Sequence, residues 1–227
     1  MKTVSQLSSL KTKLEIRNRK LRFHFLPLTS YFLLLTLLSC ATTPIDMPVY
    51  EGVDVKDVLS SKNRISAIET TFSIIFERND TEIRGDATLN ISRNGNLSLR
   101  VYSLGFLTLE LTSDNGVVKS NPSLDRNKSA ILTSGLKDCL FWWDIKDFEI
   151  DERDDTYILK NLSRKIWIDR KTMLPRKQII SLEDGRELKV YYEGSEKEGD
   201  IWYPAKMRIE LSKYSVTLRI KGISFTI

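Results

Sequence analysis

The sequence predicts a domain of the α+β class that is mainly β, in which a single curved antiparallel sheet is covered by a few short helices. Apolar and polar residues alternate along six runs between residues 86 and 221, and Asn-Gly or Asp-Gly pairs at 94–95, 115–116 and 184–185 lie between such runs. Helical spacing of apolar residues is confined to residues 53–68 and 131–145. Alternation gives a strand one dry and one wet face, as in antiparallel sheets, and these dipeptides favour tight hairpins.

Residues 1–39 are expected to be a signal peptide. A basic stretch, residues 1–22, precedes an apolar stretch of 16 residues, 23–38. This apolar stretch is shorter than the roughly 20 residues that a membrane-spanning helix needs, and it matches the hydrophobic region of a secretory signal. Residues 40–50 are then expected to form an acylated cysteine with a short tether, and residues 51–227 the folded domain.

The end of the apolar stretch, Leu37-Leu38-Ser39-Cys40, resembles the lipobox of bacterial lipoproteins. The resemblance implies that the leader is removed and that Cys40 carries acyl chains, which would hold the protein on a membrane. Ala41 follows the cysteine where inner-membrane lipoproteins of enteric bacteria have Asp. The absence of Asp at this position favours attachment of the lipoprotein to the periplasmic face of the outer membrane. The alternative is an uncleaved anchor with an incidental cysteine.

The charge and the histidine content exclude several classes of function. The 227 residues carry a formal net charge of +5, which by itself suggests a nucleic-acid partner. Residues 1–39 hold seven basic residues and one acidic residue, so the remaining 188 residues carry −1. The single histidine, His24, lies in the leader, which excludes a histidine-dependent catalytic or metal site from the domain. We therefore expect no nucleic-acid partner, no cofactor, no metal and no enzymatic activity, since no spacing predicts a pair of facing carboxylates either.

The elements follow in order along the domain. A helix is expected over residues 53–68, with Asp54 as its N-cap. About ten short strands are expected after it, interrupted over residues 118–136, and residues 131–145 are expected to form two short helical pieces. Strands resume at 147–150 and 156–159. The alternating apolar sets are Ala87/Leu89/Ile91, Leu97/Leu99/Val101, Leu107/Leu109/Leu111, Leu188/Val190/Tyr192, Met207/Ile209/Leu211 and Val216/Leu218/Ile220.

Two stretches of the domain resemble the LolA/LolB-type lipoprotein carriers, with LolB the nearer relative because of Cys40. One stretch is residues 99–116, where a strand, a short Leu-Gly loop and an alternating strand follow one another. The other is residues 202–211 with 216–220. The resemblance implies an incomplete β-barrel with a helical lid, whose interior accepts the acyl chains of a lipoprotein that a periplasmic carrier donates. It also implies delivery of that cargo to the outer membrane.

One site carries over from this resemblance. In LolB an apolar Leu in the Leu-Gly loop protrudes and promotes membrane insertion of cargo, and the matching residues here are Leu104, Gly105 and Phe106. Ser103 stands where such loops usually have Pro. The alternative is a tight hairpin with Leu104 folded back into the core.

The inward-facing residues of the strands are candidates for the lining of an acyl-chain cavity. Those candidates are Leu89, Ile91, Leu97, Leu99, Val101, Trp142, Trp143, Met207, Ile209, Leu211, Val216 and Leu218. The two tryptophans have packing of the lid as an alternative role. An apolar void of several hundred Å³ beneath residues 131–145 favours a carrier that acts as a monomer. A filled core favours a structural or assembly lipoprotein that binds a protein partner through its surface.

Overall fold

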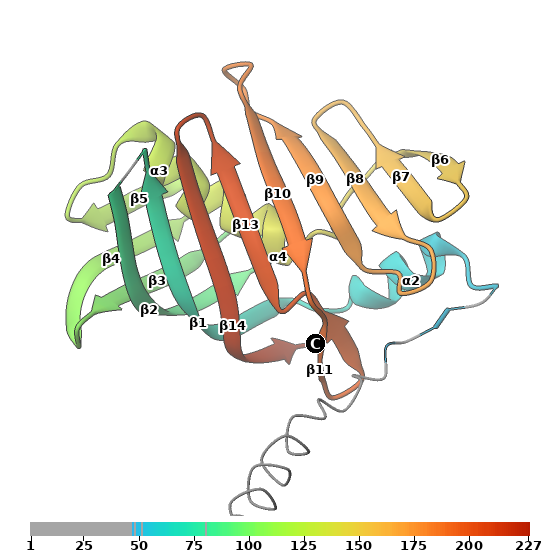
Figure 1. The fold of residues 1–227 in the computed structure, drawn as a ribbon, viewed down its shortest axis with the longest axis horizontal. Coiled ribbons are helices and arrows are strands. Elements are labelled where there is room, and N and C mark those ends of the chain that lie inside the picture. Colours follow the sequence, from blue (N-terminus) through green and yellow to red (C-terminus); the bar gives the residue numbers. More distant parts are fainter. Residues whose placement is uncertain (1–46, 48, 51, 80) are drawn as a thin grey trace, which may run out of the picture. The chain divides into compact units, whose positions relative to one another are not determined.

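The computed structural model describes residues 47, 49–50, 52–79 and 81–227 (Figure 1). They belong to one compact unit, Met47–Ile227. The expected signal peptide (1–39) and the expected lipidation site Cys40 lie outside the described residues. Among the described residues, no helix has the length and apolar character needed to cross a membrane.

A twelve-stranded antiparallel sheet dominates the described residues, in the order β5-β4-β3-β2-β1-β14-β13-β10-β9-β8-β7-β6. The first seven strands of the chain are β1 (Ala67–Arg78), β2 (Thr81–Ser92), β3 (Leu97–Ser103), β4 (Phe106–Asp114), β5 (Val117–Asn121), β6 (Glu149–Arg153) and β7 (Thr156–Lys160). The remaining strands of the sheet are β8 (Arg164–Asp169), β9 (Pro175–Ser181), β10 (Glu187–Glu193), β13 (Lys206–Leu211) and β14 (Tyr214–Thr226). A separate small ribbon pairs β11 (Glu196–Glu198) with β12 (Ile201–Tyr203).

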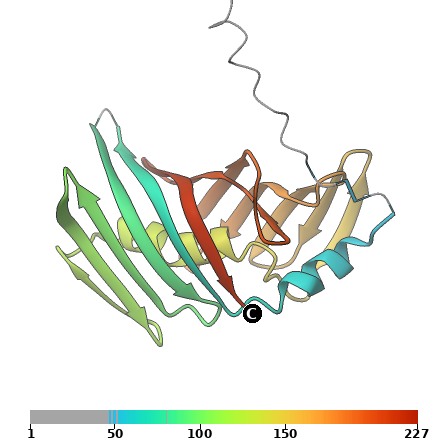
Figure 2. The same ribbon diagram turned by 90° about the horizontal axis from the view of Figure 1, so that it is seen from below.

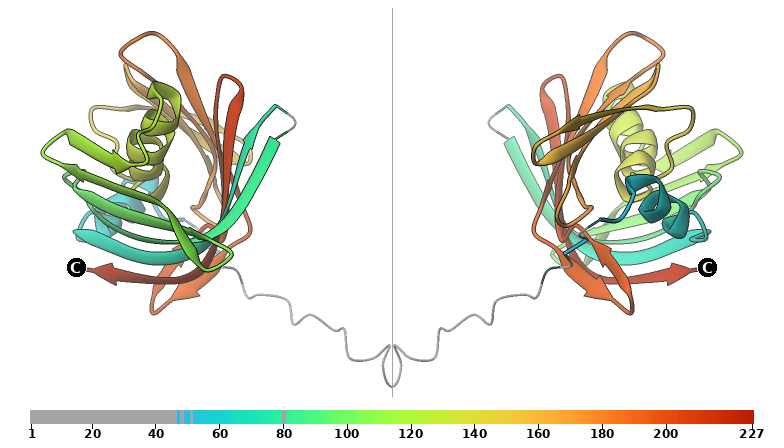
Figure 3. Two further views of the ribbon diagram at one scale, coloured as in Figure 1. Left: turned by 90° about the vertical axis from the view of Figure 1, so that its left-hand side faces the viewer. Right: turned by 90° about the vertical axis from the view of Figure 1, so that its right-hand side faces the viewer.

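The sheet curves around a helical segment without closing into a barrel, because β5 and β6 form its two free edges (Figure 3). The predicted fold class is confirmed: the domain is mainly β, with one curved antiparallel sheet and partial helical cover. Among the described residues, the buried apolar residues of the core lie between Val55 and Ile220. They form one cluster within the portion Met47–Ile227.

The helical cover consists of a short helix before the sheet and one run inside its curve (Figure 2). Helix α2 (Val55–Lys62) begins at Asp54, whose side chain accepts a 2.8 Å hydrogen bond from the Lys56 backbone N–H. The inner run comprises α3 (Arg126–Ala130), the π-helical turn η2 (Ile131–Gly135) and α4 (Leu136–Leu140). Asp125 caps its start by accepting from two backbone N–H groups at 3.0 Å.

The predicted boundaries of both helical segments are wrong. The helix expected over 53–68 stops at Lys62, and Ile65 and Ile68 are buried without belonging to it, because strand β1 begins at Ala67. The two pieces expected over 131–145 are one run that starts at Arg126 and ends at Leu140. Residues 141–145 are not helical, although Phe141, Trp142, Trp143 and Ile145 are buried. Apolar composition alone does not distinguish such a buried aromatic cluster from a helix.

The strand count of about ten is also too low. The sequence pattern did not reveal β1, β8 and β9, and it assigned residues 118–121 of β5 to an interruption. In β1 the consecutive Ile74, Ile75 and Phe76 obscure the alternation. In β8 and β9 the inward positions include Arg164 and Gln178, so polar side chains stand where the pattern requires apolar ones.

Three predicted hairpin turns are present. Gly95, Gly116 and Gly185 have φ angles of +93°, +82° and +80°. These angles are accessible to glycine at no steric cost. The turns join β2 to β3, β4 to β5, and β9 to β10, which fixes the register of half the sheet.

Candidate functional site

The interior of the sheet has two parts that differ in packing. We call the part between α4, residues 141–145 and strands β7, β8, β9, β10 and β13 the filled half. We call the part between strands β1, β2, β3, β4 and residues 122–132 the open half. Strand β14 lies between them, paired with β1 on one side and β13 on the other.

The filled half is closely packed. Leu136, Phe141 and Trp142 are almost completely buried, and the rings of Trp142 and Trp143 meet edge to face with centroids 5.7 Å apart. A side chain at Gly135 would contact Leu188 of β10 at 3.1 Å and Ile209 of β13 at 3.3 Å. Gly135 therefore allows the helical run to lie directly on these strands.

A buried polar network ends the helical run in the filled half. The Arg164 guanidinium donates hydrogen bonds to the Asp144 carbonyl at 2.7 Å and to Gln178 Oε1 at 3.0 Å. It also donates to the Asp138 and Trp142 carbonyls at 3.3 Å. Asp138 belongs to the last turn of α4, whose carbonyls lack intrahelical partners, and Trp142 and Asp144 lie in the segment after it. Arg164 thus joins the end of α4 and the following segment to strand β8.

Cys139 lies in the same half, with its Sγ 3.1 Å from Met207 Sδ. Burial raises the pKa of the Cys139 thiol far above its ordinary value. A thiol that stays protonated is neither a nucleophile nor a metal ligand. Cys139 is therefore a packing residue.

Lys62 is a buried cation at the boundary between α2 and the filled half. Its Nζ lies 5.7 Å and 5.3 Å from the ring centroids of Trp142 and Trp143, and it donates a 3.0 Å hydrogen bond to the Trp202 carbonyl. Burial lowers the pKa of Lys62 to about 8. The two rings favour the ammonium form and partly offset its desolvation.

The open half contains an apolar pocket of about 200 Å³. Its lining is Ile74, Phe76, Ile83, Arg84, Gly85, Val101, Ser103, Thr108, Leu109, Pro122, Leu124, Lys128 and Leu132. At Gly85 the Tyr102 carbonyl occupies the space that a Cβ would need, so only glycine lets β3 approach β2 here. The pocket is smaller than the roughly 300–1,000 Å³ of typical ligand pockets. The void of several hundred Å³ expected beneath residues 131–145 is not found among the described residues, because the apolar side chains of residues 136–145 are buried in the core there.

The twelve candidate lining residues lie elsewhere, with one exception. Val101 lines the pocket, and the other eleven are buried in the core cluster. Among residues 131–145, Leu132 contributes to the pocket. The lining residues that the prediction missed include Ile83 and Gly85. They continue the two-residue spacing of Ala87, Leu89 and Ile91 backwards along β2, and that signal could have found them.

An apolar rim lies at the end of the hairpins that border this pocket. Leu104, at the β3–β4 turn, is 95% exposed and has a φ of 52°, so it points away from the core. Phe106 is 76% exposed, Leu107 51%, and Ile83 on the neighbouring β2 57%. Ser103 donates a 3.1 Å hydrogen bond to the Arg84 carbonyl and links β3 to β2. We use the term apolar rim for Ile83, Leu104, Phe106 and Leu107.

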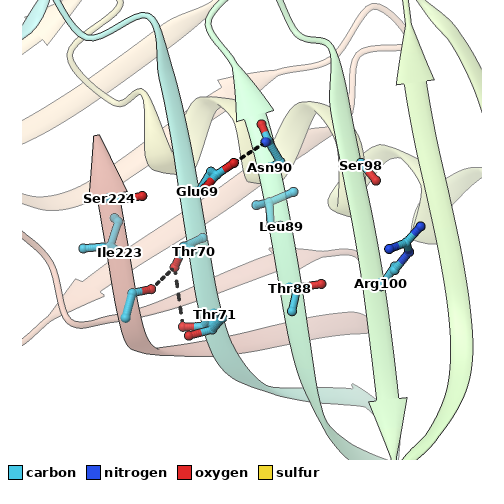
Figure 4. Close-up of a pocket in the computed structure, with 11 residues that line it drawn as sticks. Glu69, Thr70, Thr71, Thr88, Leu89, Asn90, Ser98, Arg100, Ile223 and Ser224 are labelled. Atoms are coloured by element: carbon cyan, nitrogen blue, oxygen red, sulfur yellow. Dashed lines mark hydrogen bonds between the residues drawn. The ribbon is translucent and has the colours of Figure 1, made fainter. Parts of the chain in front are cut away.

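A larger hollow of about 480 Å³ lies on the opposite, outer face of strands β1, β2, β3 and β14 (Figure 4). Its side chains are mostly polar, and Asn90 donates a 2.7 Å hydrogen bond to Glu69 within it. Such a surface offers no apolar burial to an acyl chain. The described residues contain no cluster of three or more His, Cys, Asp or Glu side chains placed to hold a metal ion.

Known proteins match this chain at the level of fold. No protein-family model and no curated protein matches it. A LolA superfamily protein from Nitrosomonas europaea is 13% identical, with 78% of this chain and 95% of that chain covered and a TM-score of 0.48. A DUF1329 family protein from Desulfovibrio piger is 13% identical, with 80% of this chain and 94% of that chain covered and a TM-score of 0.50. At this identity the similarity to the second protein shows a common fold and nothing further.

Proposed function

We propose that this chain is a non-catalytic, lipid-anchored lipoprotein of the bacterial envelope that binds an acyl chain and helps to insert acylated cargo into the outer membrane. The observation that carries this proposal is the position of an apolar pocket beside an apolar rim in the open half. A chain that leaves the pocket at the rim would pass into the bilayer with little exposure to water.

The energetics support a chain as the ligand. Each methylene buried contributes about 0.8 kcal/mol, before the cost of ordering the chain. The rim supports contact with a membrane, because four large apolar side chains on two adjacent hairpins are unusual for a surface that faces only water. Leu104, Gly105 and Phe106 would enter the bilayer interface, with Leu107 and Ile83 beside them.

The sequence motif at Cys40 supplies the anchor in this proposal. Acyl chains on Cys40 would hold the domain at the periplasmic face of the outer membrane, where a periplasmic carrier could donate the cargo. The domain would act as a monomer.

The test compares two exposed leucines. Leu104 lies in the apolar rim, and Leu162 is fully exposed at the β7–β8 turn. We expect Leu104→Glu in the full chain to impair delivery of acylated proteins to the outer membrane, and Leu162→Glu to leave it intact. Mass spectrometry of the purified wild-type chain should detect a bound acylated molecule. The carrier proposal is wrong if none is bound and both variants sort cargo normally.

A second candidate function is supported by the filled half. The domain's own side chains fill the interior around α4. A structural or assembly lipoprotein that binds a protein partner through its surface would need no cavity. A protein partner retained on affinity purification, with no acylated ligand, would favour this second function.

A further inference from the structure

The mouth of the apolar pocket carries an aromatic pair surrounded by cations. Phe76, which lines the pocket, and Tyr214 have ring centroids 5.8 Å apart. The Lys128 ammonium lies 5.5 Å from the Phe76 ring centroid. The Arg78 guanidinium and the Lys213 ammonium lie 5.4 Å and 5.9 Å from the Tyr214 ring centroid. Three cations therefore flank the aromatic pair, and two members of this cluster, Phe76 and Lys128, line the pocket itself.

The carboxylates near this cluster are already engaged. Asp125 lies 3.8 Å from Lys128, but it also caps α3 and accepts a 3.3 Å hydrogen bond from the Tyr214 hydroxyl. Glu77 of β1 accepts a hydrogen bond from Ser215 and pairs with Arg208 at 3.5 Å. Among the described residues, one carboxylate, Asp125, faces three cations, so these residues leave an excess of positive charge around the aromatic pair.

From this arrangement we infer that the pocket selects an amphiphile with an anionic headgroup, a carboxylate or a phosphate, joined to a single acyl chain. This inference rests on the proposed function and specifies its ligand. The chain occupies the space between Ile74, Leu109 and Leu132, and the headgroup lies at Lys128. The other cation of the lining, Arg84, already pairs with Glu82. An ion pair at the edge of an apolar wall is less screened than one in open water, so the headgroup adds affinity as well as orientation.

Isothermal titration calorimetry on the portion Met47–Ile227, with dodecanoate and 1-dodecanol as probes, tests the inference. Both probes have the same chain length, and they differ in charge. We expect the wild type to bind dodecanoate about five- to tenfold more tightly than 1-dodecanol, as a partly desolvated ion pair allows. Lys128→Gln should reduce this preference to below about twofold, and Lys128→Arg should restore it.

The matched control is Lys137→Gln. Lys137 lies on the same helical run, but its side chain packs near Gly95, away from the pocket lining. This variant should keep the wild-type preference. Equal binding of both probes by the wild type, or equal effects of Lys128→Gln and Lys137→Gln, would overturn the headgroup inference and leave acyl binding in place. Binding of neither probe would overturn the proposed function together with the inference.

A competition experiment identifies the source of the anion. Vesicles of phosphatidylcholine that contain phosphatidylglycerol are added to the complex with dodecanoate. If they displace dodecanoate more effectively than pure phosphatidylcholine vesicles, the headgroup belongs to a membrane lipid. If both vesicles act alike while the preference for dodecanoate over 1-dodecanol persists, the ligand is a free amphiphile. Either result supports an anionic headgroup at Lys128.

Discussion

The two halves of the interior are built on the same sheet and differ in what fills them. In the filled half, Trp142 and Leu136 are buried, Gly135 lies against β10 and β13, and Arg164 donates to carbonyls of α4 and of the segment after it. In the open half, residues 122–132 cover the sheet only in part and leave a pocket beside the apolar rim. The comparison indicates that one half stabilises the fold while the other is available for a ligand. Mutations in the two halves should therefore have different consequences.

The largest difference should come from removing a large side chain. Trp142→Ala in the filled half should lower the free energy of unfolding by about 3–5 kcal/mol, because it opens a cavity that the surrounding residues cannot fill. Ile83→Ala in the open half should lower it by less than about 1 kcal/mol, since Ile83 is more than half exposed. Urea denaturation followed by circular dichroism measures both values. Equal losses would show that the two halves are packed alike.

Enlarging a side chain sharpens the same contrast. Val190→Phe in the filled half should lower the free energy of unfolding by about 1–3 kcal/mol through overpacking, because Val190 is completely buried. Val101→Phe has the pocket to expand into, so it should cost little stability and should abolish binding of dodecanoate. Thermal denaturation and calorimetry on each variant provide the measurement. A Val101→Phe variant that binds as the wild type does would place the ligand outside this pocket.

The buried Lys62 should make the stability of the protein depend on pH in the alkaline range. Its pKa is lowered to about 8 in the folded state, from 10.5 in the unfolded state. Between these two pH values the unfolded chain binds the proton and the folded chain does not, so stability rises as pH rises. From pH 7.5 to pH 10.5, the free energy of unfolding of the wild type should rise relative to that of Lys62→Met by on the order of 1–3 kcal/mol. The cation–π contacts should reduce this rise. A stability difference between the two that stays constant with pH would contradict the assigned pKa.

The smallest effect on stability is expected at the apolar rim. Leu104→Ser should change the free energy of unfolding by less than about 0.5 kcal/mol, because Leu104 has almost no contacts to lose. The same change should reduce binding of the portion Met47–Ile227 to vesicles, as measured by flotation, whereas Leu162→Ser should not. Undiminished flotation of Leu104→Ser would remove the rim from the proposed membrane contact.

The sequence predicted those parts of the fold in which each strand keeps a regular alternation. The sets around Leu99, Ile209 and Leu218 indicated their inward faces correctly, and the glycines at 95, 116 and 185 indicated the hairpins. Strand β8 escaped detection because its buried Arg164 serves the end of a distant helix. A local pattern carries no information about such a partner.

The candidate site was harder to predict than the fold. The Leu104 loop was predicted from the resemblance to LolB-type loops, with a buried Leu104 as the alternative, and the structure leaves Leu104 exposed. The pocket could not be predicted, because Pro122, Leu124 and Lys128 reach it from a segment whose position depends on the whole sheet. The residues with the strongest apolar alternation form solid core, and the pocket lies where that alternation is weakest.

The most direct test of the account locates the bound chain. A fatty acid with a photoreactive diazirine near the end of its chain is bound to the portion Met47–Ile227, irradiated, and the labelled peptides are identified by mass spectrometry. The account predicts labels on the open half, in peptides that contain Ile74, Leu109 or Leu132, and competition by dodecanoate. Labels concentrated on residues 136–145 of the filled half, or scattered without competition, would contradict it.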